Sequence, residues 1–376
     1  MLSDIRLAKL AKNLVNYSCD LKKGEKLLIE FSDSVDYQLV GHILKEAFSV
    51  GAYPFLQMNN DRIKREVMLN MTTELADFMA KYDKYRMEDM DAYIGIRGTN
   101  NVYELSDVDP DKRKIYDIHY AQPVHHDIRV DKTKWVILRY PTEAMSQQSR
   151  MTTEKFEDFY FKVCNLDYAK MSAAMQPLVE LMDKTDKVRI VAKDTDLNFS
   201  IKDISAIKCS GLRNIPDGEV YTAPVKDSVE GVITYNAPSI YNGSEYNGVR
   251  LTFKKGKIIK AEAATPEQTK AANKIFDTDG GARYVGEFAI GVNPYVKKAM
   301  GDILFDEKIS GSIHFTPGSC YTEADNGNQS AVHWDLVLIQ TKEFGGGEIY
   351  FDGKLIRKDG SFVLPELQCL NPENLK

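Results

Sequence analysis

The pattern of hydrophobic and polar positions divides the chain into two parts. In the first part, apolar runs of strand length alternate with segments whose apolar residues recur every three or four positions, which is typical of an α/β fold. After about residue 185, short apolar runs follow one another between turn sequences and indicate a β-rich region. We therefore predict an N-terminal α/β domain with a largely parallel sheet over residues 1–184, followed by a β-rich α+β domain over residues 185–376.

The first strand–helix–strand pattern is the clearest of these alternations. Residues 26–31 and 54–58 are apolar runs, and the segment 35–47 between them carries a helical stripe of apolar residues. Gly51 stands where a glycine is expected to follow the C-terminus of a helix. Such a unit predicts two parallel strands joined by a right-handed crossover.

The remaining elements follow from the same periodicities. In the first part we expect strands at 92–96 and 135–140 and helices at about 60–84, 108–120 and 153–183. In the second part we expect strands at 188–192, 197–201, 232–235, 251–253 and 258–259, and a helix at 266–277. The pair Asp352-Gly353 predicts the turn of a late hairpin.

Composition and charge narrow the possible partners and compartment. The chain has 376 residues and a net charge of −6, which disfavours nucleic acid or an anionic membrane as its main partner. No apolar run approaches the roughly 20 residues that cross a bilayer, and the first residues lack the apolar core of a signal peptide. The five cysteines are scattered and form no Cys-x-x-Cys pair, so we expect a reducing, cytoplasmic setting.

The candidate chemistry gathers in residues 313–339. His333 and Asp335 open the apolar run 332–339, which we predict to be a strand, so both side chains should point to the same face. An imidazole and a carboxylate on one face can form half of a metal site. They can equally form a carboxylate-oriented general base, or an ordinary structural hydrogen bond. His314, 19 positions before His333, is the second histidine of this stretch.

Three glutamates are candidates to complete a site of this kind. Glu219, Glu230 and Glu287 each stand beside apolar residues, where a carboxylate is costly without a partner. Arg283 is close enough in sequence to be such a partner for Glu287. The other possibility is a metal ion, because mixed imidazole and carboxylate ligands suit zinc, manganese or cobalt. The local sequence does not rank the three glutamates.

Other polar motifs are less informative. His119, His125, His126 and Asp127 form a second polar cluster, which we expect to lie in a solvated loop between a helix and a strand. The segment 95–98 has two glycines but not the spacing of a nucleotide-binding loop. No Gly-x-Ser-x-Gly elbow or His-Glu-x-x-His helix occurs in the sequence, which sets aside serine hydrolases of that kind and the zincin metalloproteases.

Several blocks of the sequence resemble one known family. They are DLKKGEKLLIEF, KEAFSVGAYPF and KWVILRYPTEAMSQQS in the first half, and IPDGEVYTAP, GEFAIGVNP, HFTPGSCY and SAVHWDLV in the second. Their order and spacing resemble the thermophilic, aminopeptidase T-type metallopeptidases over nearly the whole chain. The last four blocks match the family segments that carry metal ligands.

The resemblance implies both a ligand set and an activity. The metal ligands implied by the matching blocks are Glu219, Glu287, His314, His333 and Asp335, and the catalytic residues implied with them are Glu219, Glu287 and Tyr321. The resemblance places Glu230 outside this set.

The activity implied is that of a metalloaminopeptidase with two divalent ions (zinc, cobalt or manganese) in the C-terminal domain. It would remove N-terminal residues from short peptides with a free N-terminus by means of a metal-activated water, and it would assemble as a homodimer. An amidase or dipeptidase of a small metabolite, or a metal-binding relative without turnover, are the alternatives. The block DEKISGSIHFTPGSCY departs from the family's usual surroundings of the first histidine, so the substrate preference stays open.

Overall fold

The chain forms two compact units, described here from a computed structural model that covers residues 4–241 and 243–376. The first unit runs to Asn165 and also includes Gly211–Ile215, and the second comprises Leu166–Ser210 and Pro216–Lys376. Helix α8 (Tyr168–Met182), which precedes the domain boundary predicted after residue 184, belongs to the second unit.

The first unit is built on a parallel sheet of five strands. Their order is β2-β1-β3-β4-β8, and every neighbouring pair is parallel. The strands are β1 (Lys26–Ser32), β2 (Tyr53–Asn59), β3 (Ala92–Arg97), β4 (Lys134–Arg139) and the short β8 (Asn214–Ile215). The predicted α/β character, the parallel sheet and the β-α-β unit at 26–58 are confirmed.

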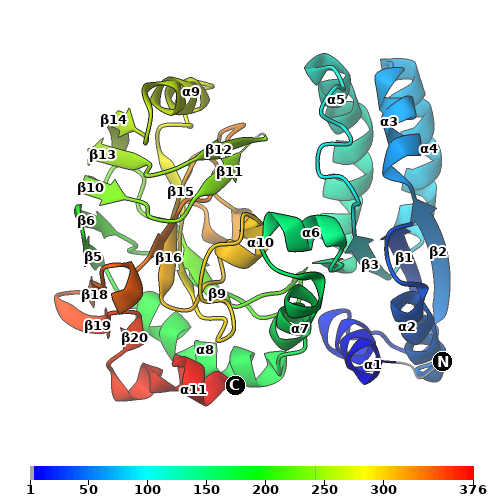
Figure 1. Cartoon of the computed structure of the whole chain (residues 1–376), viewed down its shortest axis with the longest axis horizontal. Helices are drawn as coiled ribbons and strands as arrows, with labels where there is room; N and C mark the ends of the chain where they lie inside the picture. The colour runs from blue at the N-terminus through cyan, green and yellow to red at the C-terminus, as the bar shows by residue number, and fades with distance from the viewer. Residues whose placement is uncertain (1–3, 242) are drawn as a thin grey trace. The chain divides into compact units, whose positions relative to one another are not determined.

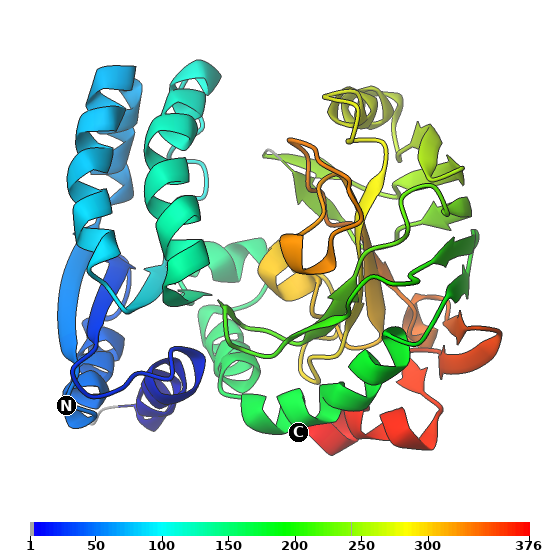
Figure 2. The ribbon, with the colours of Figure 1, turned by 180° about the vertical axis from the view of Figure 1, so that it is seen from behind.

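Helices cover both faces of this sheet, with α1 and α2 on one side and α3, α4 and η2 on the other (Figure 1). Figure 2 shows the same arrangement from behind. The helical elements are α1 (Ile5–Lys12), the π-helical η1 (Asn13–Ser18), α2 (Tyr37–Ser49), α3 (Asp61–Leu69), α4 (Thr73–Glu88), α5 (Pro110–Tyr116), the π-helical η2 (Asp117–Val130), α6 (Glu143–Gln148) and α7 (Thr153–Cys164). Asn60 and Thr72 cap α3 and α4 by accepting a backbone hydrogen bond from the first turn, as expected for these residue types.

The loop predicted around His125 and His126 is wrong, because both residues lie inside η2. Apolar residues that recur along this segment, among them Tyr120, Val124 and Ile128, pack into the core above the sheet. The polar cluster suggested a loop between a helix and a strand, but burial of this apolar stripe outweighs the low helix propensity of Pro123 within η2.

The second unit contains two antiparallel sheets and a hairpin. An eight-stranded sheet has the order β14-β13-β10-β6-β5-β18-β19-β20, a five-stranded sheet has the order β17-β16-β15-β9-β7, and β11 pairs with β12. The strands of the large sheet are β5 (Lys187–Ala192), β6 (Thr195–Ser200), β10 (Glu230–Thr234), β13 (Arg250–Lys254), β14 (Lys257–Glu262), β18 (Gly347–Phe351), β19 (Lys354–Lys358) and β20 (Ser361–Phe362). Those of the smaller sheets are β7 (Ile207–Cys209), β9 (Glu219–Thr222), β11 (Ser239–Tyr241), β12 (Ser244–Tyr246), β15 (Val285–Gly291), β16 (Ser312–Pro317) and β17 (Val337–Ile339).

An aromatic core lies between the eight-stranded sheet and the five-stranded sheet of the second unit. Phe199 of β6 has its ring centroid 5.0 Å from those of both Phe288 of β15 and Phe315 of β16. Tyr235 is buried beside them and donates a hydrogen bond to the carbonyl oxygen of Phe315 at 2.8 Å. The five-stranded sheet is thus anchored to the larger sheet through one of its faces, which leaves its other face for the polar residues.

Short helices complete the second unit. Besides α8 they are α9 (Pro266–Phe276), α10 (Ile303–Asp306), η3 (Thr322–Ala324), η4 (Lys342–Phe344), η5 (Pro365–Leu370) and α11 (Pro372–Leu375). The predicted hairpin turn is confirmed between β18 and β19, where Asp352 and Gly353 have φ angles of 47° and 82°, the left-handed pair that such a two-residue turn requires.

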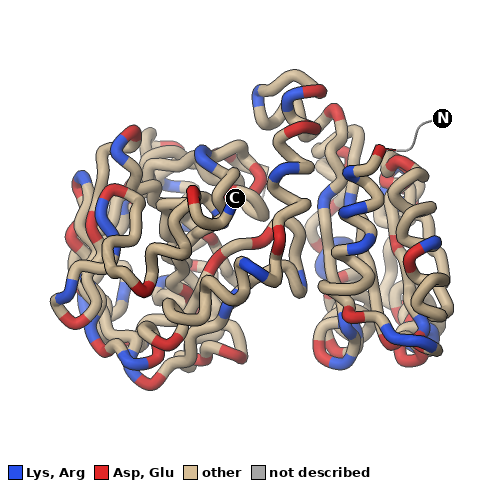
Figure 3. The backbone as a smooth tube through the Cα atoms, turned by 90° about the horizontal axis from the view of Figure 1, so that it is seen from below, with Lys and Arg blue, Asp and Glu red and all other residues tan. Residues whose placement is uncertain are grey.

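Charged residues of both signs are interspersed along each unit (Figure 3). Across residues 4–241 and 243–376, the structure contains no helix with the length and apolar character needed to span a membrane.

Candidate metal centre

The antiparallel five-stranded sheet of the second unit has a polar face, away from the aromatic core. Acidic and imidazole side chains that are far apart in sequence gather on this face. In the pairing of β15 with its neighbours, His314 of β16 lies opposite Ala289 and Glu219 of β9 lies opposite Gly291. Glu287 is two residues before Ala289 and therefore projects from the same face. Since Ala289 and Gly291 carry almost no side chain, the three longer side chains can converge over the middle of the sheet.

Glu287 stands at the centre of this cluster, and its two carboxylate oxygens face different histidines. Its Oε1 lies 3.1 Å from Nε2 of His314, and its Oε2 lies 3.2 Å from Nε2 of His333. Gly286 precedes it at an irregularity in the pairing of β15 with β16, and a Cβ atom there would lie 2.1 Å from the carbonyl oxygen of Ser319. The close approach of these two segments therefore requires glycine next to the central glutamate.

His333 and Asp335 lie just outside the strand that was predicted to carry them. The strand predicted over 332–339 is shorter, because β17 begins only at Val337, and His333 forms an isolated bridge with Gly318. The two side chains nevertheless converge as predicted, with His333 Nε2 3.3 Å from Asp335 Oδ1. The extended backbone in this segment preserves the alternation of side chains without the hydrogen bonds of a full ladder.

Neighbouring residues fix the orientation of this pair. His333 Nδ1 lies 2.9 Å from the carbonyl oxygen of Ser319; a carbonyl can only accept, so Nδ1 carries a proton and Nε2 is the ring atom that faces the carboxylates. Thr316 donates a hydrogen bond to Oδ1 of Asp335 at 2.7 Å. Outer partners of this kind commonly hold the ligands of a metal in place.

A buried lysine forms part of the cluster and was missed in the sequence. The ammonium nitrogen of Lys308 lies 2.5 Å from Glu219 Oε1, 2.7 Å from Glu307 Oε1 and 3.5 Å from Asp217 Oδ1. Only 1% of Lys308 is exposed. In the sequence Lys308 resembles any lysine of a loop between a helix and a strand, so only its proximity to three carboxylates identifies it.

The electrostatics of the cluster favour bound positive charge. Burial opposes a charged imidazole, but the carboxylates of Glu219 and Glu287 raise the pKa of His314 to about 10. Burial likewise opposes the charge on His333, yet Asp335 raises the pKa of this histidine well above its ordinary value. Burial and nearby carboxylates also raise the pKa of Glu219, against the influence of Lys308. The buried acids thus outweigh the one fixed cation and draw further positive charge into the site.

The donor set fits divalent metal ions. Among the described residues, four groups of side chains hold ligand atoms within 4.8 Å of one another, and two of these groups share Glu287: Glu219 with Glu287 and His314, and Glu287 with His333 and Asp335. Within the described chain, Glu219 Oε2 and His333 Nε2 are buried and have no hydrogen-bond partner of good geometry. Buried polar atoms are rarely left in this state, and carboxylate oxygen together with neutral imidazole nitrogen is a suitable set for zinc, manganese or cobalt.

The other residues singled out in the sequence lie at the edge of the cluster or outside it. Tyr321 is 46% exposed, and its ring centroid lies 4.9 Å from that of His333, so it flanks the cluster. Glu230 lies on β10 and accepts a hydrogen bond from the backbone of Lys255, away from the two donor groups. Arg283 pairs with Asp277 at 2.7 Å instead of with Glu287, which excludes the simplest structural partner proposed for that glutamate.

Comparisons with known proteins place the chain in a family. A family model described as thermophilic metalloprotease (M29) matches residues 3–362. Aminopeptidase 2 of Geobacillus stearothermophilus is 25% identical, with 94% of each chain covered. Aminopeptidase PepS of Streptococcus thermophilus is 24% identical, with 95% of each chain covered.

Two solved structures share the fold. Wild-type AmpT from Thermus thermophilus has a TM-score of 0.80 at 20% identity, over 96% of this chain and all of that one. The 2,5-dihydroxypyridine dioxygenase of Pseudomonas putida KT2440 has a TM-score of 0.62 at 14% identity, over 98% of this chain and all of that one. At these identities the likeness concerns architecture, and chemistry has to be argued from the site. The family match over nearly the whole chain confirms the resemblance seen in the sequence, and the protein belongs to the thermophilic metalloprotease family M29.

Proposed function

We propose that this protein is a metal-dependent aminopeptidase with two divalent ions in the cluster of the second unit. One observation carries the proposal: the two oxygens of Glu287 face two separate donor groups, with His314 on one side and His333 on the other. A shared carboxylate is the usual bridge of a two-metal hydrolase. Glu219 and His314 would hold one ion, and His333 and Asp335 the other.

Metal ions held there would polarise a scissile carbonyl and lower the pKa of a water molecule. The protein's own residues have separate tasks. Thr316 and the carbonyl of Ser319 keep Asp335 and His333 in place, and Lys308 holds one oxygen of Glu219 so that the other faces His314.

Charge and position suggest how a substrate would be held. The acidic cluster would attract the free amine of a peptide N-terminus, which is consistent with the aminopeptidase names of the sequence relatives. Tyr321, whose ring lies beside that of His333, would donate a hydrogen bond to charge that develops on the carbonyl oxygen. Glu219 and Glu287 are the carboxylates that could carry the proton to the leaving amine.

The decisive experiment compares free and blocked peptides. Chelator-stripped protein is loaded with zinc, cobalt or manganese and assayed on short peptides that begin with Leu or Ala, with their N-acetylated forms alongside. Metal-restored cleavage of the free peptides alone is the expected result. Cleavage of blocked amides of small metabolites would favour an amidase or dipeptidase, and bound metal without any hydrolysis would favour a non-catalytic relative.

We also propose that the protein is a cytoplasmic homodimer. Its five cysteines are free thiols, which suits a reducing compartment. Strand β2 is an edge strand of the parallel sheet and exposes Tyr53, Phe55, Leu56 and Met58. An exposed apolar edge strand offers unpaired backbone groups and apolar surface for pairing with another chain.

Sedimentation analysis tests the assembly. The native chain is expected to sediment as a dimer, and Leu56→Lys should shift it toward the monomer because a charge on an edge strand opposes pairing. Ile259→Lys, which alters an exposed residue of the second unit, is the matched control. A native chain that sediments as a monomer would refute the dimer.

A further inference from the structure

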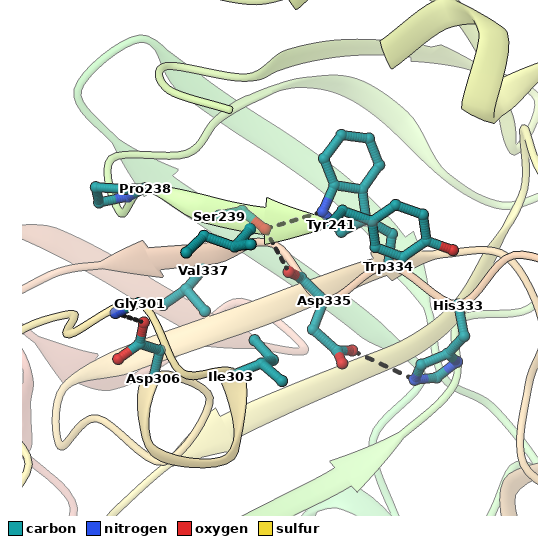
Figure 4. Close-up of a pocket in the computed structure, with 11 residues that line it drawn as sticks. Pro238, Ser239, Tyr241, Gly301, Ile303, Asp306, His333, Trp334, Asp335 and Val337 are labelled. Atoms are coloured by element: carbon teal, nitrogen blue, oxygen red, sulfur yellow. Dashed lines mark hydrogen bonds and ion pairs between the residues drawn. The ribbon is translucent and has the colours of Figure 1, made fainter. Parts of the chain in front are cut away.

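A cavity of about 160 Å³ opens directly beside the candidate metal centre. It shares His333 and Asp335 with the donor cluster, and Figure 4 shows the side chains that line it. The remaining walls come from β11 and the proline before it, from α10 and its preceding turn, and from the start of β17. The cavity therefore adjoins the proposed metal ligands and offers space for part of a substrate.

The walls away from the metal ligands are largely apolar. Ile240 of β11 is 45% exposed and Ile303 of α10 is 40% exposed, and Pro238 and Val337 lie near them. Trp334 forms part of the floor, where Tyr241 and Phe276 stack on it with ring centroids 5.0 and 5.3 Å away. An apolar group that enters this cavity would cover two exposed isoleucines, which is favourable.

Two polar groups in these walls, the carboxylate of Asp306 and the hydroxyl of Ser239, already have partners. The carboxylate of Asp306 accepts hydrogen bonds from the backbone of Met300 at 2.7 Å and of Gly301 at 2.9 Å. The hydroxyl oxygen of Ser239 accepts one from Nε1 of Trp334 at 2.9 Å. A charged side chain placed here would lose its water and find its possible partners occupied, which is costly.

The volume sets a limit on the occupant. A dry protein cavity of about 150 Å³ accommodates benzene, so a cavity of 160 Å³ matches an isobutyl, thioether or phenyl group. Glycine and alanine would leave most of the space empty.

We infer that this cavity binds the side chain of the substrate's N-terminal residue and selects apolar side chains of the size of Leu, Met or Phe. The inference rests on the proposed aminopeptidase function, because the free amine and the scissile carbonyl of the first residue must both lie at the donor cluster. The side chain of that residue is bonded to Cα, the same atom that carries the amine nitrogen and the carbonyl carbon. It must therefore enter the space that adjoins His333 and Asp335.

The first test is a substrate panel on the metal-loaded enzyme. Peptides that differ only in the first residue, which is Gly, Leu, Phe, Lys or Glu, should show a kcat/KM for Leu and Phe roughly ten- to a hundredfold above Gly. Lys and Glu should be no better than Gly. Ile303→Phe, which fills the cavity, should lower the Leu-to-Gly ratio at least about tenfold. Ile259→Phe, at an exposed isoleucine on β14, should leave the ratio unchanged.

A binding measurement separates the cavity from the catalysis. Trp334 lines the cavity and Trp135 is the chain's other tryptophan, so in a Trp135→Phe background the fluorescence reports on Trp334. L-Leucinol, which has a free amine and no bond to cleave, should bind at least about tenfold more tightly than ethanolamine, which lacks the side chain. Ile303→Phe should abolish this difference.

The two experiments separate failure of the apolar cavity from failure of the proposed aminopeptidase function. If leucinol is preferred and no peptide is cleaved, the cavity stands and the aminopeptidase function fails. If peptides are cleaved at equal rates whatever the first residue, or best with Lys, the aminopeptidase function stands and the apolar cavity is refuted.

Discussion

The ammonium nitrogen of Lys308 lies 2.5 Å from Oε1 of Glu219, in a part of the second unit that excludes solvent. The contact leaves Glu219 Oε2 facing His314 at 3.7 Å. Within the described residues this oxygen accepts no hydrogen bond. The lysine thus supplies a permanent positive charge on one side of an acidic cluster whose other side can receive a metal ion.

Replacement of this lysine should expose its structural role. Lys308→Met leaves the carboxylates of Glu219, Glu307 and Asp217 without their shared partner. We expect the chelator-stripped protein to lose about 3–5 kcal/mol of unfolding free energy, the usual cost of breaking a buried ion pair. Urea denaturation measures it, with Lys354→Met as the control, because that exposed lysine pairs with Glu366 at 3.8 Å and should cost at most about 1 kcal/mol. Equal losses in the two variants would contradict the role.

Glu287 should control the metal content of the proposed two-ion centre. Glu287→Gln removes the carboxylate that both donor groups share, so we expect the metal content after dialysis to fall from two ions per chain to below one. His314→Ala and His333→Ala should each remove about one ion, because each histidine belongs to one of these two groups. Elemental analysis measures the ratio, and Glu230→Gln is the matched control outside the cluster. Two ions retained in Glu287→Gln would exclude it as the bridge.

Gly318 should be required for the position of His333. It has a φ of +114°, and a Cβ atom there would lie 1.9 Å from the carbonyl oxygen of Val332. We expect Gly318→Ala to cost about 2–4 kcal/mol of stability and to weaken metal binding, since the adjoining strand must move. Gly353 also has a positive φ, but a Cβ atom there would meet no other described atom within 4 Å, so Gly353→Ala should cost only about 1–2 kcal/mol and leave metal binding intact. Thermal unfolding and metal titration of both variants decide this.

His125 should make the first unit sensitive to acid. Burial lowers the pKa of this histidine to about 4, although Glu30 acts in the opposite direction. Between pH 6.5 and pH 4 the unfolded chain binds a proton that the folded chain does not, so stability falls as the pH falls through this window. The loss approaches about 3 kcal/mol at pH 4 and is about 2 kcal/mol at pH 5.

Urea denaturation at pH 7 and pH 5 measures this effect. In a Trp334→Phe background Trp135 alone reports, and it lies on β4 of the first unit. His125→Gln should remove most of the difference between the two pH values, whereas His126→Gln, at the neighbouring exposed position, should not. An unchanged difference in His125→Gln would assign the acid sensitivity to other groups.

The sequence by itself determined the periodic elements. The apolar runs at 26–31 and 54–58 became parallel neighbours β1 and β2, because two strands joined through a helix pair in parallel with a right-handed crossover. The turn at Asp352-Gly353 was equally readable, since few residue pairs tolerate its backbone angles. The convergence of His333 and Asp335 followed from the alternation of side chains along an extended backbone, although strand β17 begins only at Val337.

Only the tertiary structure decided which distant residues share the site. The register of β15 with β9 and β16 brings Glu219, Glu287 and His314 over the same face, and no local pattern contains that register. The same holds for Lys308 and for the helical path through His125, because both depend on burial among residues far away in sequence. Local propensity and alternation act over a few residues, whereas pairing and burial are properties of the whole folded chain.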